Sequence, residues 1–170
     1  MRTQLKINGE IKDVEIENGE ITVIEPEKKQ TGWERAKKGT GYTCISLGVR
    51  LYPEIDSYFA TDDVAFRTAN YFTSDKLAEN INRMQTLQRQ MLRWQAENDV
   101  PINLNRKTIS KWFFYFNINS KQIEIDYTNY IKNYNVPYFS SKAKAKQCIE
   151  VFKDELTWLF TEFKWRMDGD

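Results

Sequence analysis

The stretch 111–167 constrains the fold more than any other part of the chain. It begins with an aromatic strand pattern, Trp112 to Phe116, followed by a short polar turn and a second strand pattern, Ile123 to Tyr127. The longest amphipathic run in the sequence follows Tyr138-Phe139-Ser140-Ser141. Short alternating apolar segments are typical of strands, and a period of about 3.6 residues is typical of a helix. This order predicts a strand pair with a helix on one face.

A weaker copy of the same order precedes it. Tyr42 to Leu47 and Val49 to Tyr52 have strand patterns. After an irregular stretch, 54–70, comes Tyr71-Phe72-Thr73-Ser74, and we expect a helix from Ser74 to about Glu97. The hydroxyl residues at each helix start are suited to capping its free N–H groups.

The two copies align when the chain is shifted by 67 positions. This shift places Ala78 on Ala145, Ile81 on Cys148 and Leu92 on Leu159. We therefore predict the α+β class: an antiparallel sheet with two long helices on one face, built from two ββα units. The units span 42–100 and 101–170, and we expect them to share the sheet.

The N-terminal residues 1–27 predict a separate β-hairpin ribbon. Apolar residues alternate with polar ones, and Asn8-Gly9 and Asn18-Gly19 mark two tight turns. Three basic side chains against seven acidic ones give this ribbon a balance of −4. Residues 28–41 are linker-like, and Trp33 within them is expected to fill a groove on the adjacent domain. The ribbon either packs on the main body or is presented to a partner.

The composition argues against several functional classes. The chain contains no histidine, which removes the commonest general base and transition-metal ligand, so we expect no enzyme activity, no metal and no cofactor. Carboxylates such as Asp62, Asp63, Glu124 and Asp126 form no recognisable catalytic spacing. Cys44 and Cys148 belong to no metal-type pair and are expected to be reduced thiols. The net charge of +1 gives no global field for nucleic acid or for an anionic membrane, and no apolar run is long enough to predict a membrane span.

The C-terminal helix pattern carries a second stripe. Val151, Trp158 and Trp165 are spaced by seven and lie away from the apolar face that would cover the sheet. The ribbon or Trp33 could cover this line. Alternatively, the line is a partner-binding interface, because tryptophan is enriched where partners bury surface, and heptad spacing also suits a two-fold homodimer.

Residues 101–153 form a basic and aromatic patch, with nine basic against three acidic side chains, a balance of +6. Lysines interleaved with tyrosines can track a single strand of nucleic acid by pairing with phosphates and stacking on bases. The candidate contacts are Lys132, Lys142, Lys144, Lys146, Tyr130 and Tyr134. The simpler reading is an aromatic sheet with a solvated lysine face.

Three further segments are distinctive: Gly32 to Gly39, Asn70 to Ser74 with the helix that follows, and Val136 to Ser141 with its helix. Together they resemble a family of small, mostly uncharacterised proteins encoded in phages and prophages of gut bacteria. The sequence departs from the family at 49–70, where it lacks the usual charged tight turn. The resemblance implies a mobile-element setting in a bacterial host cytoplasm. Small proteins from such settings often bind a host factor, and anti-CRISPR proteins are the best-known type.

The leading hypothesis is a non-catalytic phage or prophage binding protein. Its partner would be a host protein, plausibly a defence nuclease such as a CRISPR effector, which it would inhibit by protein contact. The alternatives are a single-stranded nucleic-acid-binding accessory protein and a virion or scaffolding component.

Overall fold

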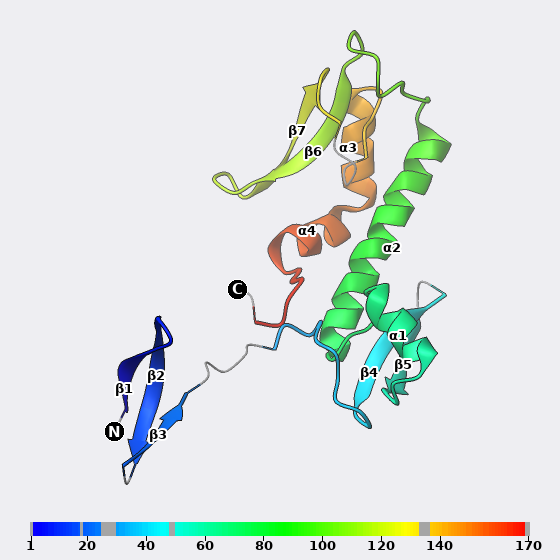
Figure 1. Cartoon of the computed structure of the whole chain (residues 1–170). Coiled ribbons are helices and arrows are strands. Elements are labelled where there is room, and N and C mark those ends of the chain that lie inside the picture. The colour runs from blue at the N-terminus through cyan, green and yellow to red at the C-terminus, as the bar shows by residue number, and fades with distance from the viewer. Residues whose placement is uncertain (1, 18, 25–29, 48–49, 133–136, 169–170) are drawn as a thin grey trace. The chain divides into compact units, whose positions relative to one another are not determined.

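The computed structural model describes residues 2–17, 19–24, 30–47, 50–132 and 137–168 (Figure 1). The chain divides into two compact units, Met1–Gln30 and Thr31–Asp170. The second unit therefore includes most of the segment predicted as a linker. The fold belongs to the α+β class, as predicted, with small antiparallel sheets.

The first unit is the predicted ribbon. Strands β1 (Arg2–Ile7), β2 (Glu10–Glu17) and β3 (Glu20–Val23) form an antiparallel sheet in the order β1-β2-β3. Asn8 and Gly9 have φ values of 52° and 90°, and Gly19 has 86°. These left-handed values are what two-residue hairpin turns require, which explains why Asn-Gly steps mark the turns.

The second unit contains two strand pairs. β4 (Gly41–Ser46) pairs with β5 (Arg50–Ile55), and β6 (Lys111–Asn117) pairs with β7 (Gln122–Thr128). The expectation that both pairs share one sheet is wrong, because each pair is a sheet of its own. The second edge of β4 is used by an isolated bridge to Phe72, and that of β6 by a bridge to Phe139. Those edges are therefore occupied at the bridging residues.

The four helices of the described residues all lie in the second unit. They are α1 (Ala60–Arg67), α2 (Asp75–Asn98), α3 (Lys142–Val151) and α4 (Lys153–Thr161). The stretch 54–70, expected to be irregular, contains α1. The second long helix is bent: at Phe152 the backbone has φ −110° and ψ 22°, and Figure 1 shows α4 turned away from the axis of α3. Phe152 packs against the core there.

Both strand pairs connect to their helices in the same way. The N–H of Thr43 donates to the carbonyl of Phe72 (2.8 Å), and the carbonyl of Thr43 accepts the N–H of Phe72 (2.9 Å). Trp112 and Phe139 exchange the equivalent bonds at 3.0 and 2.7 Å. Two residues later, Ser74 and Ser141 each cap a helix by accepting the N–H of Leu77 and of Lys144, both at 3.3 Å. The bridge to phenylalanine and the serine cap two residues later, together called the frame below, thus occur twice. This repetition supports the predicted pair of ββα units.

Two apolar clusters fill the second unit. One contains Phe72, Leu77, Ala78 and Ile81, with Trp33 packed against it as predicted. The rings of Trp33 and Phe72 lie 4.9 Å apart, centre to centre. The larger cluster brings the C-terminal half of α2 against β6, α3 and α4; its buried members are Leu87, Met91, Phe114, Phe139, Ala145, Cys148 and Leu156.

Candidate binding surfaces

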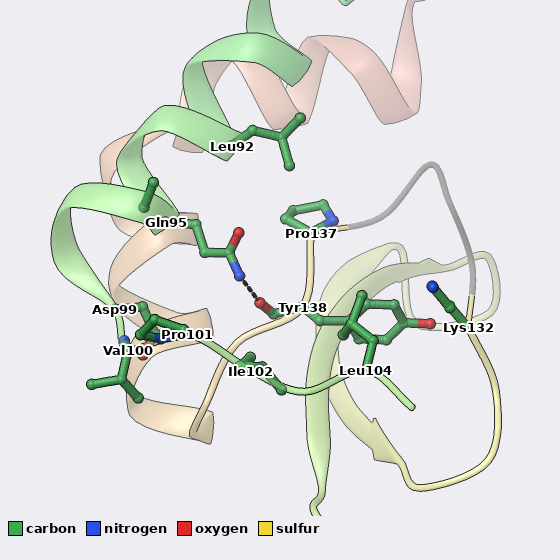
Figure 2. A pocket seen from close by; sticks show the side chains of 11 residues that line it. Leu92, Gln95, Asp99, Val100, Pro101, Ile102, Leu104, Lys132, Pro137 and Tyr138 are labelled. Carbon is green, nitrogen blue, oxygen red and sulfur yellow. Dashed lines mark hydrogen bonds between the residues drawn. The ribbon is translucent and has the colours of Figure 1, made fainter. Parts of the chain in front are cut away.

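A cavity of about 500 Å³ opens beside the C-terminal end of α2 (Figure 2). Three segments build it: the last turns of α2, the irregular chain that follows, and the residues leading to the Phe139 bridge. Most of its walls are apolar; the apolar lining residues are Leu92, Ala96, Val100, Pro101, Ile102, Leu104, Pro137 and Tyr138. A volume of this size falls in the range of ligand-binding sites, about 300–1,000 Å³.

Hydrogen bonds hold the cavity walls together. The Gln95 side-chain amide donates to the carbonyl of Tyr138, which ties α2 to the opposite wall (Figure 2). The Asp99 carboxylate accepts the backbone N–H of Ser140 (2.8 Å) and its hydroxyl, and it also accepts the N–H of Val100 (2.8 Å). Gln95 and Asp99 are therefore engaged in building the walls, and the surface offered to a ligand is mainly apolar.

Among the predicted site residues that the structure describes, Lys132 is the one that lines this cavity. Figure 2 shows its side chain on the side of Tyr138 and Leu104. The apolar residues of the chain Val100 to Leu104 were not among the predicted site residues. Their signal was present in the sequence, because four of the five residues 100–104 are apolar and directly follow a helix end.

A buried polar network lies at the other end of the second unit. Asp56 is fully buried and accepts bonds from Arg35 Nε (2.9 Å), the Tyr71 hydroxyl (2.9 Å) and the Tyr58 N–H (2.8 Å). The hydrogen bond from Arg35 is the main reason that the pKa of Asp56 falls to about 2. A carboxylate held this firmly in its ionised form is a poor proton acceptor at neutral pH, so Asp56 is suited to anchoring Arg35 rather than to acid–base chemistry.

The same network contains two stacked phenols. The rings of Tyr42 and Tyr71 lie 3.9 Å apart, and the Tyr42 hydroxyl donates to Asp62 (3.0 Å). Burial, together with the hydrogen bond to Asp56, raises the pKa of Tyr71 to about 12, and burial likewise raises the pKa of Tyr42. Both phenols therefore stay protonated at neutral pH. Arg35 also lies over the ring of Tyr58, 4.6 Å from its centre.

The predicted line of Val151, Trp158 and Trp165 does not form. Val151 is 58% exposed on α3, whereas Trp158 is only 8% exposed, with the Arg83 guanidinium 4.0 Å above its ring. Trp165 follows α4 and is 69% exposed; its carbonyl accepts the indole N–H of Trp33 (2.8 Å). The bend at Phe152 and the end of α4 before Trp165 break the heptad phase, so seven-residue spacing no longer places the three side chains on one face.

The predicted basic and aromatic patch is only partly assembled. Tyr130 is 82% exposed and Lys132 is exposed nearby in the chain. On α3, Lys142 and Lys146 are exposed one turn apart, while Lys144 is half-buried. Tyr134 lies outside the described residues. Lys111, counted in the basic balance, is instead buried, and its ammonium donates to the carbonyls of Arg106, Ile109 and Asn129 at 3.0, 3.3 and 3.0 Å.

A second, shallower hollow lies between α2 and α3. It joins two residues that the sequence placed in different candidate sites, Lys146 and Val151. Trp94, Ala143, Gln147 and Glu150 complete its lining. It has a volume of about 570 Å³ and is more open to solvent than the cavity at the end of α2.

The described ranges contain no group of three histidine, cysteine or acidic side chains able to hold a metal ion. Cys44 and Cys148 carry free thiols, and burial raises the pKa of both. Among the same residues, no helix combines the length and the hydropathy that a membrane crossing requires.

No protein-family model matches the chain, and neither a curated protein nor a solved structure is similar to it.

Proposed function

We propose that this chain is a non-catalytic binding protein that takes apolar side chains of a partner protein into the cavity at the end of α2. The observation that carries the proposal is the cavity itself: about 500 Å³, with mainly apolar walls. Because Gln95 and Asp99 are occupied in holding those walls together, the cavity favours an apolar occupant over a charged one.

The partner class comes from the resemblance to phage and prophage proteins. In that setting, the protein would act in the bacterial host cytoplasm by binding a host protein. The specific proposal is inhibition of a defence nuclease of the anti-CRISPR type, by contact rather than by chemistry. The buried carboxylates are in keeping with a role without catalysis, because Asp56 and Asp62 each accept hydrogen bonds from several donors.

The binding part is tested with a library of random peptides selected on the full chain. The blocking variant is Ala96→Trp, which places an indole in the cavity, and the matched control is Ala143→Trp, which alters an exposed alanine on α3 that lines the second hollow instead, so the pair also tells the two surfaces apart. We expect selected peptides rich in apolar residues, with affinity lowered at least about tenfold by Ala96→Trp and unchanged by Ala143→Trp. Peptides that bind both variants equally would contradict the cavity as the site.

The partner class is tested separately, with purified host defence nucleases and their DNA substrates. The expected result is that the wild-type protein and Ala143→Trp suppress cleavage, while Ala96→Trp does not. If the cavity binds selected peptides but no nuclease is inhibited, the binding site stands and the partner class is wrong. Circular dichroism of both variants verifies that they are folded.

Binding to single-stranded nucleic acid is the second candidate, favoured by the exposure of Tyr130 beside Lys132. It predicts binding to an oligonucleotide that weakens steeply between about 50 and 200 mM salt, because lysine contacts release counterions from phosphates. Lys142→Glu with Lys146→Glu should weaken that binding further. An unchanged anisotropy of the labelled oligonucleotide at low salt would exclude this candidate.

A further inference from the structure

The outer edge of β7 presents unpaired backbone groups. Both backbone groups of Trp112 are used on the side of β6 that faces Phe139. In an antiparallel pair, hydrogen-bonded and non-hydrogen-bonded residue pairs alternate. Trp112 pairs with Tyr127 in the register, so the residues of β7 whose N–H and C=O groups point away from β6 are Ile123, Ile125 and Tyr127.

One of these donors is already occupied within the strand. The N–H of Tyr127 donates to the side chain of Asp126 (2.7 Å). Within the described ranges, the outward N–H and C=O groups of Ile123 and Ile125 have no hydrogen-bond partner, and no strand pairs with this edge. In Figure 1, β7 lies at the margin of its two-stranded sheet, with β6 on one side only. The edge therefore offers two donors and their neighbouring acceptors to an added strand.

The outer edge of β5, in the other strand pair, is less able to accept an added strand. Pro53 of β5 pairs with Thr43, which bridges to Phe72. Tyr127 of β7 occupies the equivalent position, because it pairs with Trp112, which bridges to Phe139. Proline has no N–H to offer at an edge. β7 contains neither proline nor lysine, the two residue types that natural edge strands commonly use against pairing.

The side chains of β7 define what an added strand must carry. Ile123 and Ile125 pack against the larger apolar cluster on the inner face. On the outer face, Glu124 is fixed by Tyr115 Oη (2.9 Å), Asn117 Nδ2 (2.8 Å) and Ser120 Oγ (2.8 Å), with Asp126 beside it. An added strand would thus meet apolar side chains on one face and two carboxylates on the other.

A second copy of β7 does not fit this edge well. Symmetric antiparallel pairing of two β7 strands would bring Glu124 and Asp126 against the same residues of the other copy. Like charges directly opposite each other across strands are destabilising. Complementary charge instead favours lysine or arginine in the added strand.

We propose that β7 is a strand-addition site for an extended segment of a partner protein in which apolar residues alternate with lysine or arginine. Backbone hydrogen bonds to Ile123 and Ile125 would supply the affinity, and the carboxylates of Glu124 and Asp126 would supply the preference for basic side chains. This site is separate from the cavity at the end of α2 and does not depend on the function proposed for that cavity.

The test uses the full chain and a short synthetic peptide in which lysine and valine alternate. Residue-resolved amide exchange by NMR should show protection of Ile123 and Ile125 raised at least about tenfold by the peptide, because their N–H groups become bonded. The N–H of Glu124, which faces β6, should show no comparable change. A peptide in which glutamate replaces lysine should bind at least about tenfold more weakly.

Two proline variants test the backbone edge, and a double variant tests the charge. Ile125→Pro removes an outward N–H and should abolish peptide binding, whereas Tyr127→Pro removes one already used by Asp126 and should leave binding within about threefold. If Ile125→Pro does not fold, the double variant Glu124→Gln and Asp126→Asn decides: it should weaken the lysine peptide about tenfold or more without affecting a threonine–valine peptide. The proposal is overturned by peptide binding that leaves the Ile123 and Ile125 amides unprotected, by no binding at all, or by a dimer of the chain that Ile125→Pro abolishes.

Discussion

The two strand pairs of the second unit share a frame and differ in what covers it. In both, the first strand bridges to a phenylalanine two residues before a serine cap. Around β4, helix α1 and the Arg35–Asp56 pair cover the face opposite α2. Around β6 there is no such helix in the described residues, and an irregular chain leaves a cavity beside Tyr138. One copy of the frame is thus closed by a buried polar network, and the other leaves space for a ligand.

The residue immediately before each bridging residue also differs between the two strand pairs. Tyr42 precedes Thr43 and donates its hydroxyl to Asp62 at the start of α1. Lys111 precedes Trp112 and donates to the carbonyls of Arg106, Ile109 and Asn129. Both side chains bury a polar end to hold a neighbouring connection, since buried polar groups must find partners. The frame therefore tolerates different side chains at this position, provided that each hydrogen-bonding end is satisfied.

The largest expected effect tests whether the two frames are equivalent. Phe72→Ala and Phe139→Ala each delete a fully buried ring at a bridge, so each should lower the free energy of unfolding by about 3–5 kcal/mol. Urea unfolding followed by circular dichroism measures both values. A difference of more than about 2 kcal/mol between them would show that one frame contributes much more to stability than the other.

A smaller effect is expected where the chain before β4 approaches α2. Gly32 has φ +89°, and a Cβ there would lie 2.7 Å from Leu77 Cδ2 and 3.1 Å from Met167 Cγ. Gly32→Ala should lower the free energy of unfolding by about 2–3 kcal/mol through backbone strain and overpacking. The control is Gly39→Ala, which has φ +82° but no atom within 4 Å, and should cost only about 1 kcal/mol. Equal urea midpoints for the two variants would contradict the close approach.

The helix caps should contribute less. Ser74→Ala and Ser141→Ala each remove one side-chain acceptor from a helix N-terminus, and each should cost about 1 kcal/mol. Replacement by Asp, which also caps, should restore most of the loss in thermal unfolding experiments. Failure of Asp to restore stability at one site would show that the serine there acts through packing.

Lowering the pH should reduce the stability of the fold, although no effect is expected near neutral pH. The pKa values of Asp56 and Glu34 are about 2 in the folded protein, below their ordinary 3.8 and 4.5. For Asp56 the hydrogen bond from Arg35 is the main cause; for Glu34 the bonds from Thr31 and Gly32 together outweigh the opposing effect of burial. Their ionised forms stabilise the fold above pH 4.5, and this contribution is lost as pH falls from there towards 2.

Amide exchange at decreasing pH would locate that loss. The region around β4 and α1 should lose protection before the region around β6 and α3. In the latter, the carboxyl group with a lowered pKa is Glu124, on the exposed outer face of the sheet. Simultaneous loss in both regions would mean that the polar network contributes no local stability of its own.

Local features were predictable because neighbouring residues determine them. The Asn-Gly turns, the aromatic strand β6 and the caps at Ser74 and Ser141 all depend on contacts within a few residues. Trp33 was also predicted to fill a groove, because a lone indole in a polar segment needs apolar contact. Helix α1 was missed because its eight residues are too few to show a helical period, and because it depends on Asp62 accepting bonds from Ser57, Phe59 and Tyr42.

The candidate sites depended more on tertiary structure. The heptad line required one straight helix, and a change in the backbone at Phe152 removed it. The cavity beside Tyr138 arises from segments distant in the sequence, and the burial of Lys111 depends in part on Asn129, 18 residues away.

By itself, the sequence determined the ribbon, the two strand pairs and the starts of their helices, because hydrophobic period, turn residues and caps act over short distances. Only the tertiary structure decided that the strand pairs stay separate, that the last helix bends, and which apolar surfaces remain open. Those outcomes depend on side chains far apart in the chain competing for the same space, and no local pattern records that competition.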